Sequence, residues 1–221
     1  MKRICMITLA FLATLAAVMA SCNDNEPEHP ENTEQESSKP VNPDNASDDE
    51  TDNEKESEPE TVGKILVAYY SHSGNTQTIA GYIHDAVGGD IVKIETVTPY
   101  PSDYDEHLAQ ARREVADGYL PPLKTKVDNI ADYDVVFVGY PIWVETAAPP
   151  IASFLASHDL KGKTVVPFCT SGTSSAAASY RLVGSYCKES TVLEGIQIRR
   201  GTYDTAHERV ILWLNNLGFK K

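Results

Sequence analysis

Three long apolar runs, separated by segments of helical periodicity, constrain the fold of this chain more strongly than any other feature of its sequence. The runs are residues 64–70 (KILVAYY), 134–140 (DVVFVGY) and 163–170 (KTVVPFCT). An apolar run of this length, without alternating polar residues, is typical of a strand whose two faces are both buried. We therefore expect a central sheet that is covered on both sides.

Helical segments alternate with these strands. In residues 76–87, Ile79, Ala80, Ile83 and Val87 share one side of a helix, and a Gly-Gly pair ends it. The same reasoning predicts helices over 103–116 (apolar side Leu108, Ala109, Ala111 and Val115), 149–157, 175–187 and 204–217, and further strands over 90–95 and 191–198. Five strands that alternate with helices predict an α/β fold with a doubly wound parallel sheet.

The negative charge of the chain lies mainly outside this alternating region. The 221 residues carry a net charge of −13. Residues 23–62 contain 15 acidic and 2 basic side chains, whereas residues 63–221 contain 17 acidic and 15 basic ones. A nearly neutral domain without a basic patch is not expected to bind nucleic acid. Residues 63–221 suffice for one domain with a sizeable core.

The N-terminus has the features of a secretory signal. A short basic start precedes an apolar run over residues 4–18, which is too short for a typical spanning helix. The following Ala-Ser-Cys22 resembles the lipobox of bacterial lipoproteins, which implies removal of residues 1–21 and acylation of Cys22, for example with palmitate. We therefore expect a protein attached to the bacterial cell envelope through its lipid alone, on the periplasmic or surface side of the outer membrane. An ordinary cleaved signal peptide is the alternative.

Residues 22–62 are predicted to form a disordered acidic tether. Five prolines lie among Asn, Ser, Asp and Glu, and Val41 is the only large aliphatic residue before Val62. Such a composition buries too little apolar surface to offset the entropy of ordering. A flexible chain of this length has a root-mean-square span of about 35 Å. Asp24 and Glu26, close to Cys22, leave a sorting signal for surface export as a second interpretation.

Three polar or aromatic loops follow the predicted strands at their carboxyl ends, where ligands bind in doubly wound sheets. The first is Ser71-His-Ser-Gly-Asn-Thr76, whose hydroxyls and free N–H groups at a helix start suit a phosphate. The second, after Gly139, places Tyr140, Ile142 and Trp143 on a mobile loop, where a flat aromatic ligand would cover them. Trp143 is expected to support little packing, with a loop aromatic folded onto the domain as the alternative. The third offers the hydroxyls and backbone donors of residues 170–175. We interpret His72 as a solvent-facing residue.

The segments YSHSGNT (70–76), GYPIW (139–143) and PFCTSG (167–172) resemble those of the flavodoxin family. The resemblance extends from Lys64 to about Leu217. It implies a three-layer α/β/α domain whose five-stranded sheet has the order 2-1-3-4-5 and binds FMN without a covalent bond. It also implies the binding residues: Ser71, Ser73, Gly74, Asn75 and Thr76 at the 5′-phosphate; Tyr140, Pro141, Ile142 and Trp143 beside the isoalloxazine; and Thr170, Ser171 and Gly172 at its far edge. No catalytic or metal-binding residue is assigned.

The sequence departs from the family pattern after Trp143. Relatives commonly continue with a second tryptophan and a glycine, whereas this chain has Val144 and Glu145. A carboxylate near the flavin would disfavour its anionic reduced form, but Glu145 is expected to point into solvent. The secretory signal also leaves open which redox partner protein or small-molecule acceptor the domain serves.

Three functions remain open at this point. The first is electron transfer by bound FMN at the cell envelope. The second is an FMN-dependent NAD(P)H oxidoreductase that acts on quinone-like or nitro-aromatic substrates, which needs open space beside the segment 100–123. The third is an envelope binding module that has lost the flavin.

Cys169 and Cys187 are not expected to form a disulfide. The predicted helix between them spans about 18 Å, and a disulfide needs Cα atoms within roughly 7 Å. Cys169 is interpreted as a buried small hydrophobic residue, with a redox-active thiol as the alternative.

Overall fold

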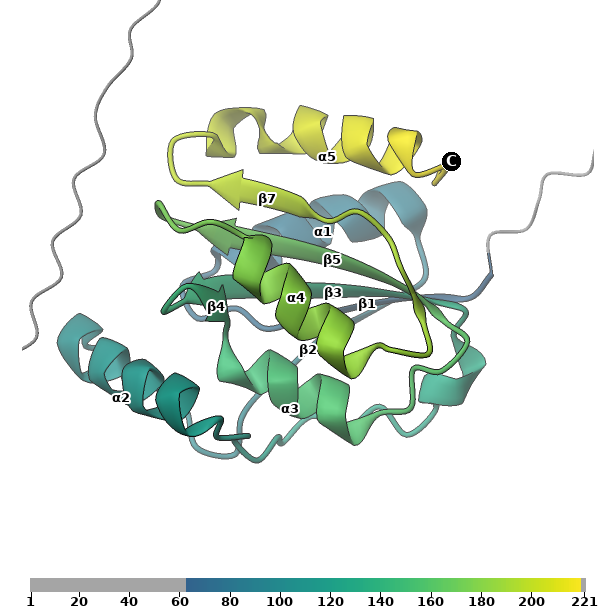
Figure 1. Cartoon of the computed structure of the whole chain (residues 1–221). Coiled ribbons are helices and arrows are strands. Elements are labelled where there is room, and N and C mark those ends of the chain that lie inside the picture. The colour runs from purple at the N-terminus through teal and green to yellow at the C-terminus, as the bar shows by residue number, and fades with distance from the viewer. Residues whose placement is uncertain (1–62, 220–221) are drawn as a thin grey trace, which may run out of the picture. The chain divides into compact units, whose positions relative to one another are not determined.

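A parallel sheet with the strand order β2-β1-β3-β5-β6 forms the middle of the domain (Figure 1). The computed structural model describes residues 63–219, so the predictions for residues 1–21, Cys22 and the tether lie outside the described part of the chain. The strands of the sheet are β1 (Ile65–Tyr69), β2 (Asp90–Lys93), β3 (Val135–Trp143), β4 (Thr146–Ala147), β5 (Thr164–Ser171), β6 (Thr191–Val192) and β7 (Ile196–Arg199).

The doubly wound sheet with the order 2-1-3-4-5 is confirmed. β6 and β7 pair with different parts of β5, so together they take the place of the single strand predicted over 191–198. β4 was not predicted, and it pairs antiparallel with the end of β3. In the register of the central strands, Tyr69 lies beside Gly139 and Gly139 beside Phe168. The carboxyl ends of β1, β3 and β5 therefore meet at one edge.

Side chains alternate between the two faces of the sheet, and the central strands β1, β3 and β5 are buried on both faces over most of their length. On β1, Leu66 and Ala68 pack into one core, and Val67 into the other. The helices α1 (Asn75–Val87) and α5 (Ala206–Asn216) cover the Val67 face, while α3 (Pro149–Ser157) and α4 (Ala177–Tyr186) cover the opposite one (Figure 1). This arrangement is the reason that the strands read as continuous apolar runs.

The helix α2 (Tyr104–Asp117) lies beyond the carboxyl ends of the strands rather than on a face of the sheet (Figure 1). Asp103 caps it by accepting hydrogen bonds from the N–H groups of Asp105 and Glu106, both at 3.0 Å. The apolar side predicted for this helix was only partly right. Ala111 of the predicted side is buried, but the other buried residue of the helix is Glu114, which was not part of that side. A helix at the edge of a sheet meets a narrower surface than one on its face.

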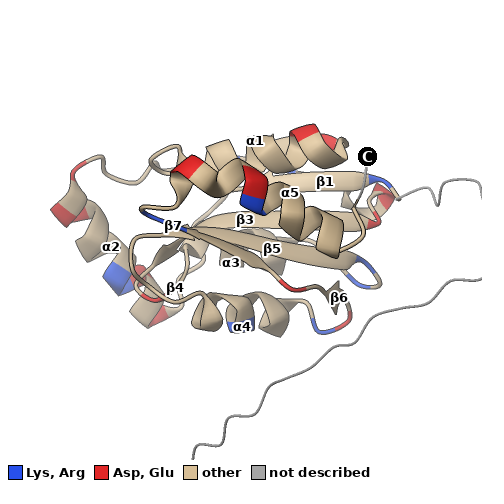
Figure 2. Ribbon diagram, turned by 90° about the horizontal axis from the view of Figure 1, so that it is seen from above, with Lys and Arg blue, Asp and Glu red and all other residues tan. Residues whose placement is uncertain are grey.

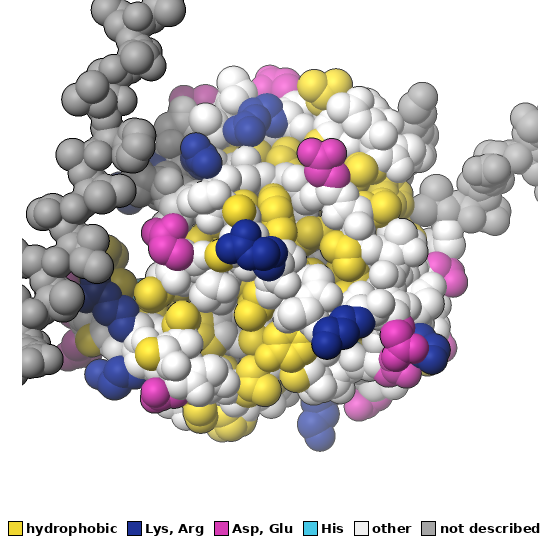
Figure 3. All heavy atoms as spheres, viewed as in Figure 1, with side chains coloured by type: hydrophobic (Ala, Val, Ile, Leu, Met, Phe, Trp, Pro, Cys, Tyr) yellow, Lys and Arg dark blue, Asp and Glu magenta, His cyan; other side chains and the backbone are white. Residues whose placement is uncertain are grey.

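Charges are distributed over the whole surface of the domain. Two short 3-10 helices, Ile130–Asp132 and Tyr203–Thr205, complete the elements. Acidic and basic residues are scattered among uncharged ones along the helices and loops (Figure 2). On the face that carries α3 and α4, apolar side chains are interspersed with polar and charged ones (Figure 3). No helix within residues 63–219 has the length and apolar character needed to cross a bilayer.

Candidate functional site

The first loop turns the chain from β1 into α1 through a glycine with a positive φ. Gly74 has a φ of 92°, and a Cβ built on it would meet no atom within 4 Å. The backbone conformation, not the available space, therefore requires glycine at this position. Ser71 Oγ accepts a hydrogen bond from the Gly74 N–H at 3.2 Å, and Asn75 Nδ2 donates to Ser73 Oγ at 3.2 Å.

The N-terminus of α1 has the properties of an anion site. No side chain caps it, and its first turn contains no acidic residue. The first bond within the helix runs from the Thr78 N–H to the Gly74 carbonyl at 3.0 Å, so the preceding N–H groups have no partner inside the helix. These donors and the helix dipole favour a phosphate at this position, and the hydroxyls of the loop supply further donors. The residues present fit the phosphate of a nucleotide.

Thr76 links the first loop to the third. Its side chain is 1% exposed, and its hydroxyl lies 2.8 Å from the hydroxyl of Thr170, which is 3% exposed. Two hydroxyls that share one hydrogen bond retain one O–H proton for another acceptor. The pair thus holds the first and third loops together, and one of its two hydroxyl groups can still donate a hydrogen bond to a ligand.

The second loop is an ordered hairpin, which corrects the expectation of a mobile loop. β3 continues to Trp143, which pairs with Thr146 of β4 across a turn formed by Val144 and Glu145. Both turn residues have positive φ values, 47° and 63°, as a type I′ turn requires. A β-branched residue such as Val144 is strained in this conformation. The two residues that depart from the family pattern are therefore those that form the tight turn.

Trp143 packs against four other rings, contrary to the expectation that it packs little. Its ring centroid lies 4.2 Å from that of His107, 4.8 Å from Tyr100, 5.4 Å from Tyr70 and 5.8 Å from His72. The Tyr100 hydroxyl donates a short hydrogen bond to the buried carboxylate of Glu114, the last member of this network. The pKa of Tyr100 is raised, first by burial and then by this carboxylate.

The other residues predicted in the second loop differ in what they present to a ligand. Pro141 and Ile142 are half-buried at the end of β3. Tyr140 is fully buried, and its hydroxyl lies 3.4 Å from Ser179 Oγ in the core. Any contact of Tyr140 with a ligand is therefore left to its main chain.

The third loop is fixed by hydrogen bonds to its neighbours. Gln197 of β7 donates to Ser171 Oγ at 2.7 Å and to the Ser174 carbonyl at 2.6 Å. Ser174 Oγ in turn donates to Glu145 Oε1 at 2.8 Å, which joins the third loop to the second. Glu145 is exposed as predicted, but its carboxylate is held by this bond. Gly172 is exposed between these anchored residues.

The structure thus brings together the three predicted loops, and it adds residues that the sequence did not reveal. Gln197 carried a weak signal, because it stands as a polar residue between Ile196 and Ile198 at the end of the last strand. His107 carried none, since it lies in a polar helix whose position over the edge is set by tertiary contacts.

Cys169 does not belong to the chemistry of the site. It is fully buried, and burial raises the pKa of its thiol to about 12. Cys169 and Cys187 are both free, which confirms that they do not pair. The interpretation of Cys169 as a buried hydrophobic residue is therefore supported over that of a redox thiol. Within residues 63–219, no group of three or more metal-ligating side chains could hold a metal ion.

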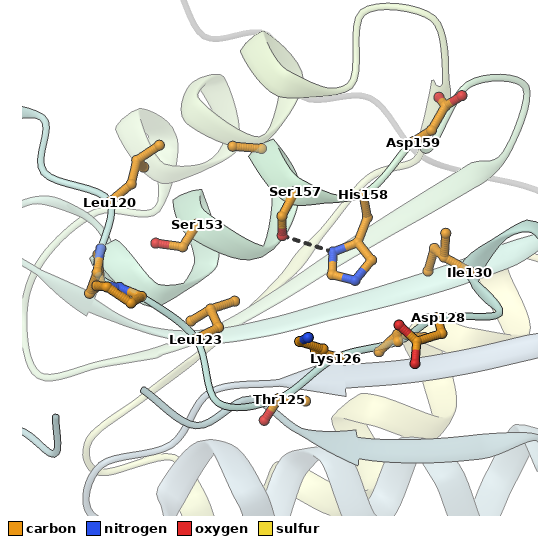
Figure 4. Close-up of a pocket in the computed structure, with 14 residues that line it drawn as sticks. Leu120, Leu123, Thr125, Lys126, Asp128, Ile130, Ser153, Ser157, His158 and Asp159 are labelled. Atoms are coloured by element: carbon orange, nitrogen blue, oxygen red, sulfur yellow. Dashed lines mark hydrogen bonds between the residues drawn. The ribbon is translucent and has the colours of Figure 1, made fainter. Parts of the chain in front are cut away.

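Two cavities flank this region. The larger, about 700 Å³, lies between residues 120–130 and the second half of α3, and none of the predicted binding residues lines it (Figure 4). In it, His158 Nδ1 donates to the Phe154 carbonyl at 2.8 Å and lies 3.1 Å from Ser157 Oγ. The smaller, about 270 Å³, adjoins the first loop at Ser71 and His72 and reaches the segment 93–100.

Comparisons with known proteins identify the family. A family model described as flavodoxin matches residues 64–217. The chain belongs to the flavodoxin family. A solved structure described as a flavoprotein from Bacteroides eggerthii is 37% identical, with a TM-score of 0.62, over 71% of this chain and 99% of the other.

Two further proteins resemble the flavodoxin-family domain more distantly. A flavoprotein from Lactobacillus acidophilus, solved in complex with FMN, is 22% identical, with a TM-score of 0.53, over 65% of this chain and 97% of the other, and shows the shared fold. An NAD(P)H dehydrogenase (quinone) from Nitrobacter winogradskyi is 31% identical over 121 residues, which are 51% of this chain. The matched part spans 58% of that relative's length.

Proposed function

We propose that the flavodoxin-family domain binds FMN and transfers electrons at the bacterial cell envelope. The observation that carries this proposal is the uncapped N-terminus of α1 at the edge where the three predicted loops are joined by hydrogen bonds. Membership of the flavodoxin family supports a flavin at this edge, and the related Lactobacillus protein was solved with FMN.

The residues of the site would divide the work of holding FMN. Ser71, Ser73, Thr76 and the N–H groups at the start of α1 would bind the phosphate, without a lysine or arginine in the loop. Trp143, with Pro141 and Ile142, would lie beside the isoalloxazine, and the third loop would contact its other edge. Bound FMN supplies a centre that accepts and releases one or two electrons.

Fixed partners make this site preorganised. The turn at Val144 and Glu145 is held by Ser174, and Ser174 is held by Gln197. Because these groups already satisfy one another, binding the cofactor does not require the loops to be ordered at that moment. The carboxylate of Glu145 would place a negative charge at the rim of the site, which disfavours an anionic reduced flavin.

An FMN-dependent NAD(P)H oxidoreductase is the second candidate. The cavity of about 270 Å³ beside Ser71 and His72 offers space for another molecule next to the proposed cofactor. The Nitrobacter relative, named as a quinone-reducing NAD(P)H dehydrogenase, points in the same direction. A quinone-like or nitro-aromatic compound would be the acceptor in this case, whereas a carrier would serve a partner protein.

The proposed location at the envelope rests on the N-terminal sequence. An acylated Cys22 and an acidic tether of residues 23–62 would hold the domain away from the outer membrane, facing the periplasm or the surface. The tether would take no part in the site. A chain that begins at Thr61 is accordingly expected to bind FMN as tightly as one that begins at Cys22, and a weaker affinity of the shorter chain would contradict this role.

Absorption spectroscopy of the purified protein tests the proposal. We expect the full chain, incubated with FMN and freed of excess, to show a flavin spectrum with one FMN per chain. Bleaching by dithionite, but not by NADH or NADPH, is expected of a carrier. Bleaching by a nicotinamide, followed by reoxidation with a quinone, would instead assign the reductase. If no flavin is retained, the domain is a binding module and the proposal is wrong.

A further inference from the structure

Few contacts hold α2 over the carboxyl edge of the sheet. Only Ala111 and Glu114 of this helix are buried, and its exposed residues include charged ones of both signs (Figure 2). Burial of apolar surface therefore contributes little to its docking. A helix attached in this way is expected to open more readily than the core helices α1 and α5.

His107 makes the central contact between α2 and the site. Its ring stacks on that of His72, with the centroids 4.4 Å apart and the planes at 22°, and packs on Trp143 at 4.2 Å. The Nε2 atom of His107 is buried and has no hydrogen-bond partner. A neutral ring fits this position, whereas a protonated ring would bury an unpaired N–H donor and a charge beside a second histidine.

The groups that face His107 do not neutralise such a charge. They are His72 from the first loop, Tyr100 from the segment before α2, and Glu114 on α2 itself. The carboxylate of Glu114 is already engaged by the Tyr100 hydroxyl and by Gln110 Nε2, the latter at 2.8 Å. Burial and then His72 lower the pKa of His107, and the opposing effect of Glu114 is smaller.

We propose that α2 is a pH-dependent lid over the flavin site, closed while His107 is neutral and released when this ring, which stacks on His72, takes up a proton. The part of the proposal that concerns flavin rests on the function proposed above, because Trp143 is the residue that the lid covers. The ordinary pKa of histidine is 6.5. Well above this value the His107 ring is neutral in both the released and the docked helix, and pH has no effect on closure. As the pH falls through 6.5, the released helix binds a proton first, so closure weakens by at most tenfold per pH unit for one proton.

Amide hydrogen exchange of the full chain without flavin tests the lid by itself. The opening of α2, corrected for intrinsic exchange and compared with that of α1, is expected to increase as the pH is lowered from about 7.5 to about 5.5.

Variants of His107 test whether this residue causes the response. The increase should vanish in His107→Phe, which keeps an aromatic ring, and in His107→Gln, a second neutral variant in case the first disturbs the fold. His207→Phe is the matched control, because the ring of His207 in α5 packs edge-on against that of Tyr82 in α1, with the centroids 5.1 Å apart, and in the described part of the chain makes no ring contact with α2. It should retain the wild-type response. Equal opening of α2 at both pH values in the wild type, or an unchanged response in both His107 variants, would overturn the proposal.

The rate of FMN release tests what the lid covers. Release is expected to accelerate on acidification in the wild type and in His207→Phe by several-fold more than in His107→Phe. The phosphate of FMN titrates near pH 6, so the difference between variants carries the test and not the absolute rate. If α2 opens at low pH but release is the same in all variants, α2 does not cover the flavin. Failure to bind FMN at any pH would contradict the proposed function, while the exchange experiment would still decide whether the lid exists.

Discussion

Replacing Thr76 and Thr170 by valine separates the structural role of their hydrogen bond from a role in binding phosphate. The two hydroxyls lie 2.8 Å apart and are almost fully buried. Valine has nearly the shape of threonine but no hydroxyl. Thr76→Val or Thr170→Val alone therefore leaves one buried hydroxyl without its partner, whereas the double variant replaces the pair by an apolar contact of the same shape.

The magnitudes follow from this burial. Each single variant is expected to lower the free energy of unfolding of the apo-protein by about 1–3 kcal/mol, the usual penalty for a buried polar group left unpaired. The double variant should recover most of that loss. The affinity for FMN should nevertheless stay about 5- to 150-fold lower in Thr76→Val and in the double variant, because the donor to the phosphate is gone. Thr76→Ala should weaken FMN binding to a similar extent.

Urea unfolding of the apo-proteins and titration with FMN and riboflavin provide the two measurements. Riboflavin lacks the phosphate, so its affinity should change little in every variant. Ser153→Ala is the control, since it removes a buried hydroxyl that bonds only to the Pro149 carbonyl of its own helix, at 3.4 Å. Equal losses for FMN and riboflavin, or a double variant that binds FMN like the wild type, would show that the phosphate does not lie at Thr76.

Three further predictions concern single residues. Trp143→Ala should destabilise the apo-protein by about 2 kcal/mol in urea unfolding, because the half-buried indole contacts four rings; an unchanged stability would mean that these contacts contribute nothing. Val144→Gly should raise the free energy of unfolding by about 1 kcal/mol, since glycine adopts the positive φ of this turn without strain; a loss of stability would contradict the strain. Cys169, with a pKa of about 12, should react with a thiol reagent near neutral pH only after unfolding, and rapid labelling of the native protein would exclude the buried position.

The outline of the site could be predicted because the carboxyl ends of parallel strands lie at one edge of the sheet, so segments that are distant in the sequence come close together there. Ser71, Trp143 and Thr170 are far apart in the chain, but each lies at or just beyond the carboxyl end of a strand. The carboxyl ends of these parallel strands must lie at the same edge of the sheet. Their residue types then indicated a nucleotide site. The arrangement of individual side chains was not accessible in this way, since the bond from Ser174 to Glu145 depends on how two loops approach each other in space.

The contacts of Trp143 also could not be predicted from the sequence. As a residue in a loop of the sequence it was expected to pack little, yet β3 continues through it and β4 pairs with it. The pairing with β4 and the contacts with Tyr100 and His107 depend on how these segments meet in the folded domain, which the sequence pattern does not show. The departure at Val144 and Glu145 was visible in the sequence, but only the φ angles showed its consequence for the turn.

The sequence by itself determined the helices, the central strands and the edge at which the site lies, because apolar runs and apolar periodicity are local properties that can be recognised along the chain. Tertiary structure alone decided that α2 covers this edge, that Tyr140 faces the core and that Thr76 meets Thr170. The physical reason is that these outcomes depend on the packing of surfaces from distant segments. A side chain's partners, unlike its tendency to be buried, are set only when those surfaces are brought together.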